Sequence, residues 1–479
     1  MKGMCFMENE KMAVTPVKKL LLSMGVPMIL SMVLQAVYNI VDSAFVSNMA
    51  QNGELALNAL TLAFPAQMLM VAISIGTGVG VNVLTANSLG HQDKETANKA
   101  AGNAVFMAGV IYIVFFLFGL FGAKIYIQSQ TKDTVIAEMA NDYLTICCVF
   151  SFGLVFFSIY EKLLQAAGHS LCSTAAQIAG AAVNIILDPI MIYGLLGFPE
   201  MGVKGAAYAT VIGQVVSFAV AFILHLKVNK SVSKNPHYIK PSLKIIGRIY
   251  AIGFPAIIAQ ALMSVMTYGL NIILGGISDS MVTAYGLFYK IQQFLLFAAF
   301  GIRDAITPIT AFNFGMGSRK RINETVKYGI IFTAVIMIAG TIAIELFAEP
   351  FSAVFGLSGE TQKLCIGAMR IISFSFVFAG ANIAFQGVFQ ALGGGVESLI
   401  VSICRQIAFI FPFVILFSEL AKKDYGYIQT VWLSFPIAEV LSTVVAVLLF
   451  RRIYAKKVSV FHDDDRECPK SDNFLLEEK

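Results

Sequence analysis

Long apolar runs separated by short polar segments dominate the chain. We searched with a window of about 20 residues, because a helix of that length crosses about 30 Å of hydrocarbon. Each apolar run predicts a transmembrane helix, since a backbone surrounded by lipid must satisfy its hydrogen bonds within its own segment. The twelve segments cover residues 18–47, 57–87, 98–123, 135–163, 171–196, 202–226, 244–275, 283–313, 324–348, 365–391, 396–419 and 428–454.

The chain also repeats itself. Gly25-x-Pro27 returns as Gly253-x-Pro255, an offset of 228 (253 − 25), and Gln165-x-x-Gly168 returns as Gln390-x-x-Gly393, an offset of 225 (390 − 165). Each half contains an even number of segments, so both halves start on the same side of the membrane. We therefore predict an all-α integral membrane protein of twelve transmembrane helices, arranged as two parallel six-helix repeats around a central cavity.

This repeat divides the chain into parts. We expect a cytoplasmic N-terminal segment at 1–17, an N-lobe of helices one to six at 18–226, and a basic cytoplasmic linker at 227–243. A C-lobe of helices seven to twelve follows at 244–454, and a disordered cytoplasmic tail at 455–479.

Composition agrees with a membrane protein and excludes a soluble domain. The chain is 57% hydrophobic and only 13% charged, and its mean hydropathy is +0.75. The net charge of +5 does not indicate nucleic-acid binding, because the basic residues are concentrated near the ends of the predicted spans. The stretch 227–248, for example, holds six Lys and Arg residues and no acid. If the chain crosses the membrane twelve times, the basic residues at 11–19, 319–327 and 451–457 lie on the same side of the membrane as the stretch 227–248. The positive-inside rule then predicts a multi-pass protein of the cell membrane with both termini in the cytoplasm.

Enzyme and cofactor motifs are not found in the sequence. The seven Cys form no Cys-x-x-Cys pair, the five His are scattered, and there is no Gly-x-x-x-x-Gly-Lys-Ser/Thr, His-Glu-x-x-His or Gly-x-Ser-x-Gly motif. We expect a protein that is not an enzyme, uses no cofactor and binds no nucleic acid. Its environment is the lipid bilayer, and we expect a monomer.

Two acids fall inside apolar segments of the first half. An ionisable side chain at membrane depth costs at least about 2.5 kcal/mol, so Asp42 and Asp188 need a reason to be there. Tyr38 shares a helix face with Asp42, and Asn184 shares one with Asp188, because each pair is four residues apart. Pro189 removes a backbone donor beside Asp188. The pattern predicts a cation or proton site in the N-lobe; the alternative is that one or both acids lie in the headgroups.

Two prolines occupy equivalent positions in segments one and seven. Pro27 and Pro255 can make these helices bendable, so that the cavity changes shape. The alternative is a static kink that neighbouring helices tolerate.

The second half carries its own charges at membrane depth. Because Arg303 and Asp304 are adjacent, we expect that they cannot face each other on a helix and that at least one has a partner elsewhere. These charges form either an internal salt-bridge network or a cavity lining that touches substrate. They are Lys290, Arg303, Asp304, Arg370, Arg405 and Glu439. The candidate cavity-lining residues of both halves are Gln35, Asn39, Gln67, Lys290, Gln292 and Arg303.

Taken together, these residues resemble the multidrug and toxin extrusion (MATE) family. The similarity rests on the proline-containing first helix with Tyr38 and Asp42, on the segment 184–189 that ends in Asp188-Pro189, and on Gly205-Ala206-Ala207-Tyr208-Ala209-Thr210. The resemblance covers residues from about 18 to 454. The major facilitator class also has twelve helices, but its Gly-x-x-x-Asp-Arg-type loop is missing at 87–94.

The resemblance implies an antiporter that exports small organic cations, driven by inward H⁺ or Na⁺. It implies a cation site at Asp42, Asn184, Asp188 and Thr210, with Tyr38 and Tyr143 lining it, and a Na⁺ ion would bind Asp42, Asn184 and Asp188. Helices seven and ten have no interior acid, in contrast to some members, and Ser158 stands where some members have Asn.

The predicted mechanism is alternating access. H⁺ or Na⁺ neutralises Asp42 and Asp188, which weakens their hold on a cationic drug before the lobes rock. One competing interpretation is a lipid or oligosaccharide flippase for an anionic, tailed substrate, which a cavity dominated by Arg303, Arg370 and Arg405 would favour. Another is an intramembrane aspartyl protease using the same two acids; the missing Gly-x-Gly-Asp motif and the repeat argue against it.

Overall fold

The computed structural model describes residues 11–49, 53–354 and 358–461. Within them, ten helices are long and apolar enough to cross a membrane, and two bent helix pairs bring the number to twelve. The predicted all-α, twelve-span architecture is confirmed. The predicted disordered tail falls mostly on residues outside the described part of the chain.

The N-lobe consists of the helices from α2 to α9. Side-chain caps explain some of their starts: the Asp93 carboxylate accepts from the Thr96 amide at the beginning of α4, and Asp133 does the same for Val135 and Ile136 in α6. The elements are α2 Val17–Ser47, α3 Gly53–Gly90, α4 Lys94–Leu117, η1 Phe118–Gly122, α5 Ala123–Gln130, α6 Thr134–Val149, α7 Phe152–Ala166, α8 Ser170–Tyr193, η2 Leu195–Gly197 and α9 Val203–Val228.

The C-lobe repeats this order after a short connection that contains η3, Pro236–Ile239. Its elements are α10 Leu243–Gly275, α11 Asp279–Gly315, α12 Arg319–Val354, α13 Gly359–Ser373, α14 Phe376–Ala391, α15 Gly395–Ile403, η4 Cys404–Ala408, α16 Ile410–Lys423, η5 Tyr425–Leu433, α17 Ser434–Ile453 and η6 Tyr454–Val458.

The repeat seen in the sequence is present in the geometry. The fourth span of each lobe is broken at the same place, with a bend of 46° between α6 and α7 and of 54° between α13 and α14. The next span begins at Ser170 in one lobe and at Gly395 in the other, 225 residues apart (395 − 170). The offset of 225 therefore relates equivalent positions in this part of the two lobes.

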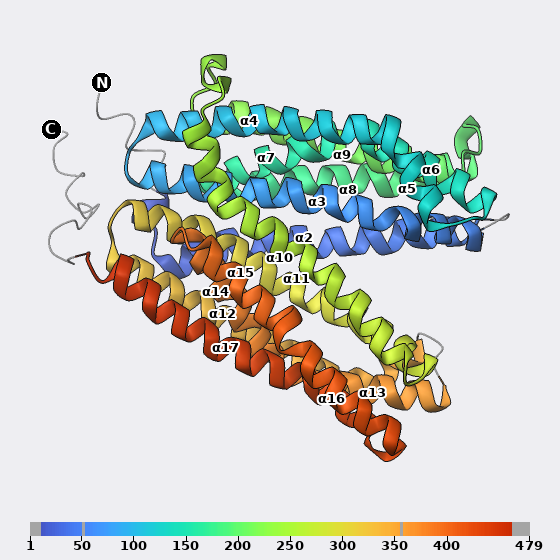
Figure 1. Ribbon diagram of the computed structural model, residues 1–479. Helices are drawn as coiled ribbons and strands as arrows, with labels where there is room; N and C mark the ends of the chain where they lie inside the picture. The colour runs from blue at the N-terminus through green and yellow to red at the C-terminus, as the bar shows by residue number, and fades with distance from the viewer. Residues whose placement is uncertain (1–10, 50–52, 355–357, 462–479) are drawn as a thin grey trace, which may run out of the picture.

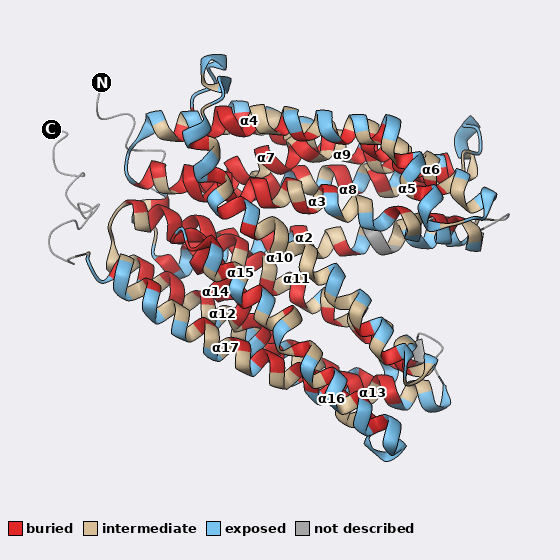
Figure 2. Ribbon diagram, in the orientation of Figure 1, coloured by how far each residue is buried: buried red, intermediate tan, exposed pale blue. Residues whose placement is uncertain are grey.

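The two lobes converge at one end and diverge toward the other (Figure 1). We call the end where α2 begins and η6 ends the terminal end, and the opposite end the open end. Buried residues gather inside each bundle and where the lobes meet, while the outer faces are largely exposed (Figure 2). Those outer faces carry large apolar side chains such as Ile125, which is 71% exposed, as expected for surfaces that face lipid.

Contact between the lobes pairs helix α2 with α11 and helix α3 with α10. Glycines allow this close approach. A Cβ atom on Gly76 would lie 3.0 Å from the Gly253 carbonyl oxygen, and one on Gly315 would lie 3.0 Å from the His91 amide nitrogen. Gly90 and Gly315, which are 225 residues apart (315 − 90), pack against each other's backbone. Backbone therefore meets backbone at the terminal end.

Polar contacts add to this closure. Thr77 of α3 and Tyr250 of α10 share a hydrogen bond of 3.2 Å between their hydroxyl oxygens. The Arg321 guanidinium in α12 donates to the carbonyl oxygens of Met12 and Thr15 at 2.8 and 3.0 Å. These bonds fasten the chain before α2 to the C-lobe.

The connection between the lobes lies against α4. The Asn103 amide donates to the Lys240 carbonyl oxygen at 3.3 Å, and its side-chain oxygen accepts from the Ser242 amide at 2.7 Å. The Ser233 amide donates to Asn98 at 2.6 Å. The connection is thus held on the N-lobe before α10 begins.

Candidate functional site

A cavity lies inside the N-lobe, between α2, α3, α7, α8 and α9. Its volume is about 110 Å³, which is room for several water molecules. Four of the residues predicted from the sequence line it: Gln35, Tyr38, Asn184 and Thr210. The remaining lining residues are Ser31, Met32, Val71, Ile75, Leu154, Phe157, Ser158, Glu161, Lys162, Gln177, Gly180, Ala181, Gly213, Gln214 and Ser217.

Asp188 is joined to the wall of this cavity through Asn184, one helical turn earlier in α8. The Asn184 amide nitrogen donates to Asp188 Oδ1 at 3.1 Å, and the Asp188 residue is fully buried. Asp188 Oδ2 and Asn184 Oδ1 are buried without a hydrogen-bond partner among the described residues. Buried oxygens without a partner are rare and call for an explanation such as an ion.

Asp42 faces the same region from α2. Helix α2 packs against α8, which carries Asp188, and the Asp42 Oδ1 atom is also buried without a partner in the described chain. The fold thus brings together two acids that lie 146 residues apart (188 − 42). Oxygen atoms of this kind suit H⁺ or a hard cation such as Na⁺, so the residues fit the implied ion chemically.

Tyr143 reaches this group from α6. The Gln67 amide of α3 donates to the Tyr143 hydroxyl and to the Cys147 sulfur, both at 3.4 Å. Tyr143 is close enough for its hydroxyl to interact with the charge of Asp42. Tyr143 and Gln67 therefore belong to the surroundings of Asp42, although neither lines the cavity itself.

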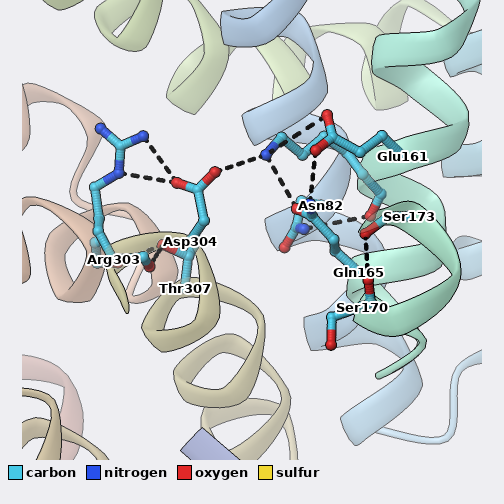
Figure 3. Close-up of polar contacts among 10 residues, drawn as sticks. Asn82, Glu161, Gln165, Ser170, Ser173, Arg303, Asp304 and Thr307 are labelled. Atoms are coloured by element: carbon cyan, nitrogen blue, oxygen red, sulfur yellow. Dashed lines mark hydrogen bonds and ion pairs between the residues drawn. The ribbon is translucent and has the colours of Figure 1, made fainter. Parts of the chain in front are cut away.

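A buried charge network connects the two lobes beside this cavity, whose lining includes Glu161 and Lys162. Lys162 Nζ of α7 lies 2.8 Å from Asp304 Oδ2 of α11 and donates to Gln165 Oε1 at 3.0 Å. Glu161 accepts from the Gln165 amide at 2.9 Å. The side chains of Lys162 and Asp304 are only 4% and 7% exposed. Figure 3 shows Asp304 between Arg303 on one side and the Glu161 and Gln165 group on the other.

Glu161 and Lys162 are not among the residues predicted from the sequence. They lie beside the predicted end of segment four at 163, where charged residues are common. The signal that would have found them is a pair of adjacent charges followed by Gln165, within a helix that continues to Ala166. Their partner lies in the other lobe, and no local pattern points to it.

One expectation about these charges was wrong. Adjacent Arg303 and Asp304 do contact each other, because Nε and Nη2 of Arg303 donate to Asp304 Oδ1 at 3.0 and 2.8 Å. The guanidinium is long enough to span neighbouring positions that shorter side chains cannot. The other half of the expectation is confirmed, since Asp304 also has a distant partner in Lys162.

A second cavity lies in the C-lobe and is closed on one side by α3. We call it the C-lobe cavity; its volume is about 30 Å³. Arg303 and Arg405 line it, whereas Arg370 pairs with Glu349 on the exposed surface at 3.3 Å. The full lining is Ile75, Val79, Ala256, Ala259, Gln260, Met263, Phe300, Arg303, Gln386, Gln390, Ser402, Arg405 and Gln406.

The remaining candidates lie elsewhere. Lys290 is exposed and Gln292 is buried, and neither lines either cavity; Lys290 is 13 residues before Arg303 (303 − 290), about 20 Å along α11. The side chain of Asn39 is outside the described part of the structure. Pro27 and Pro255 lie within the uninterrupted helices α2 and α10.

Comparison with known proteins gives a consistent result. The family model described as MatE matches residues 27–190 and 255–416, so that both lobes are covered. The multidrug export protein MepA of Staphylococcus aureus (strain MSSA476) is 24% identical over 436 residues, which is 91% of this chain and 94% of MepA. MepA of Staphylococcus saprophyticus is 23% identical and covers 89% of this chain and 91% of that protein.

Solved structures show the same similarity. A multidrug resistance MATE family transporter of the MOP superfamily, in an outward-facing conformation, has a TM-score of 0.87 and 26% identity, covering 94% of this chain and 98% of that one. A MOP superfamily transporter from Pyrococcus furiosus, described as having a binding pocket of reverse polarity, has a TM-score of 0.84 at 26% identity and the same coverage. The relatives are transporters rather than enzymes. This chain belongs to the MatE family and is a multi-pass membrane transporter of the multidrug efflux type.

Proposed function

We propose that this protein is a secondary antiporter of the cell membrane that works as a monomer and exports small organic cations in exchange for H⁺ or Na⁺. The observation that carries the proposal is the pair of acids, Asp42 and Asp188, on the neighbouring helices α2 and α8, each with a buried oxygen that has no hydrogen-bond partner among the described residues. Relatives that are multidrug export proteins support the direction of transport.

The coupling ion would bind at this pair. A proton would bind the carboxylates themselves, while Na⁺ would be held by Asp42, Asn184 and Asp188. The Ser158 hydroxyl oxygen lines the same cavity and is buried without a partner in the described chain, so it offers one further oxygen. Neutralising the acids weakens their attraction for a cationic drug, which is then released. One charge that moves inward through 100 mV supplies about 2.3 kcal/mol for this exchange.

The proposed orientation places both termini in the cytoplasm. The terminal end, where the lobes meet, then faces the cytoplasm, and the open end faces outward. The similarity of the whole chain to an outward-facing transporter structure supports this assignment. To reach the opposite state, the α2–α11 and α3–α10 contacts must separate, and the Lys162–Asp304 pair must break.

Export can be tested with a fluorescent organic cation in cells that lack their own efflux pumps. The wild-type protein should lower accumulation, and Asp188→Asn should abolish the effect at matched expression. Asp142→Asn is the matched control, because Asp142 pairs with Lys204 at the lobe surface at 3.0 Å and should leave export unchanged. Imposed Na⁺ or pH gradients across proteoliposomes would then identify the coupling ion. Normal export by Asp188→Asn would refute the proposal.

The flippase remains a second candidate because of one observation. Of the three arginines expected in such a cavity, Arg303 and Arg405 line the C-lobe cavity and Arg370 does not. Wild-type cells that accumulate the cation as strongly as empty cells would favour this candidate, and lipid-linked substrates should then be tested.

A further inference from the structure

The two cavities are equivalent parts of the repeat. Glu161, Gly180 and Ala181 line the N-lobe cavity. The residues 225 positions later (386 − 161, 405 − 180, 406 − 181) are Gln386, Arg405 and Gln406, and all three line the C-lobe cavity. The same internal niche has therefore been formed twice, once in each lobe.

The C-lobe copy has the more basic lining. Its lining among the described residues holds the guanidinium groups of Arg303 and Arg405 and no acidic residue, whereas the N-lobe lining holds one acid, Glu161, beside one base, Lys162. Side-chain amides add hydrogen-bond donors to the C-lobe lining. They belong to Gln260, Gln386, Gln390 and Gln406.

Acids that balance the two arginines lie outside this lining. Glu439 of α17 accepts from Arg405 Nε at 2.6 Å, and Asp304 accepts from Nε and Nη2 of Arg303. The structure gives Arg405 no other hydrogen-bond partner among the described residues, so both of its Nη nitrogens are available. These bonds use Nε of Arg405 and Nε and Nη2 of Arg303, so the remaining guanidinium nitrogens of these two cavity-lining residues can still donate.

We propose that the C-lobe cavity is a binding subsite for the carboxylate of an amphipathic substrate. A guanidinium edge presents two parallel N–H groups that match a carboxylate. The volume of about 30 Å³ holds roughly two water-sized groups, which suits a carboxylate and not a whole molecule. Phe300 and Met263 line the same cavity and provide an apolar surface beside the acid group.

The rest of such a substrate extends toward the N-lobe. Ile75 of α3 lines both cavities, so the two are neighbours across this residue, and we place the rest of the substrate in the N-lobe cavity. Its cationic part would lie in the N-lobe cavity near Glu161, and its carboxylate near Arg405. This inference rests on the proposed export function and adds zwitterionic acids to its substrate class.

The test measures equilibrium binding to the purified full-length protein in detergent. The probes are a rhodamine with a free carboxylate and its methyl ester, which differ only in the anionic group, and fluorescence anisotropy reports binding. Wild-type protein should bind the acid more tightly than the ester. The double variant Arg405→Gln/Glu439→Gln, which leaves no unpaired charge behind, should weaken acid binding about tenfold or more and leave ester binding unchanged.

Matched variants make the result specific. Arg370→Gln/Glu349→Gln applies the same two changes to the exposed pair of the same lobe and should change neither probe. Arg405→Lys keeps the positive charge but loses the two parallel N–H donors, so the protein should lose part of its preference for the acid over the ester. This variant serves as the test if the double variant does not fold. Equal losses for acid and ester, or no loss for either, would overturn the proposal.

Two further outcomes are distinguishable. If added anionic lipid displaces the acid probe in wild-type protein and the double variant is insensitive to the lipid, the subsite takes a lipid phosphate, and the proposal is wrong. Because binding is measured without an ion gradient, a failure of the antiport function would leave the ratio of acid to ester affinity unaffected.

Discussion

Asp304→Asn removes the negative charge that Lys162 and Arg303 share at the contact between the lobes. The Lys162–Asp304 distance is 2.8 Å, and both side chains are almost completely buried. Removing one partner of a buried pair costs about 3–5 kcal/mol. Lys162 keeps its bond to Gln165 and lies 4.0 Å from Glu161, so its charge is not left without a partner. We therefore expect the smaller cost of one lost charged hydrogen bond, about 1.5–3 kcal/mol.

This loss falls on one conformation only, because the pair exists where the lobes meet. The equilibrium constant between the conformation with the lobes in contact at the terminal end and the conformation with the lobes apart there should therefore shift roughly ten- to a hundredfold toward the second. Spin labels at exposed positions 99 in α4 and 320 in α12, in a cysteine-free background, would report this as a population at longer distance. Glu349→Gln, which breaks an exposed pair inside the C-lobe, is the control. An unchanged distance distribution in Asp304→Asn would show that the pair does not hold the lobes together.

Three further changes test other parts of the structure. Gly315→Val places a side chain against the α3 backbone and should abolish export and lower stability by about 1–3 kcal/mol; Gly109→Ala, with no atom within 4 Å of its Cβ, should do neither. Asp93→Ala removes the α4 cap and should cost about 0.5–2 kcal/mol in unfolding experiments. Because the hydrogen bonds with Thr96 lower the Asp93 pKa from 3.8, this contribution is present above about pH 4 and is lost as the pH falls through the lowered pKa; an equal cost at acid pH would contradict it. Asn103→Ala should speed tryptic cleavage after Lys230 and Lys234, and unchanged cleavage would show that Asn103 does not hold the connection.

The sequence predicts the architecture well because its causes are local. Hydropathy is a property of each segment, and the repeat is visible as matching motifs, so the twelve spans and the two lobes follow directly. The bends after Val149 and Ser373 do not, because nothing in the hydropathy of 135–163 or 365–391 interrupts the run.

Individual site residues depend on helix rotation and distant partners. Asp42 and Asp188 were predicted because acids are costly at membrane depth, and the fold brings them together. Arg370 and Arg405 look alike in sequence, yet one faces outward and pairs with Glu349, and the other lines a cavity. Lys162 was missed because its partner lies 142 residues away in the other lobe.

The glycine contacts at the terminal end have a consequence for the energetics of repeated closure. A side chain that docks into a pocket loses rotamer entropy, up to about 2 kcal/mol for the longest ones. Gly90 and Gly315 have no side-chain rotamers to lose, so closure of the lobes at this contact carries no such entropic cost. Separation of the lobes here also leaves no vacated side-chain pocket to be hydrated. The contact can therefore be tight in its geometry and still close to neutral in free energy, which leaves the few polar bonds around it to decide which way the lobes move.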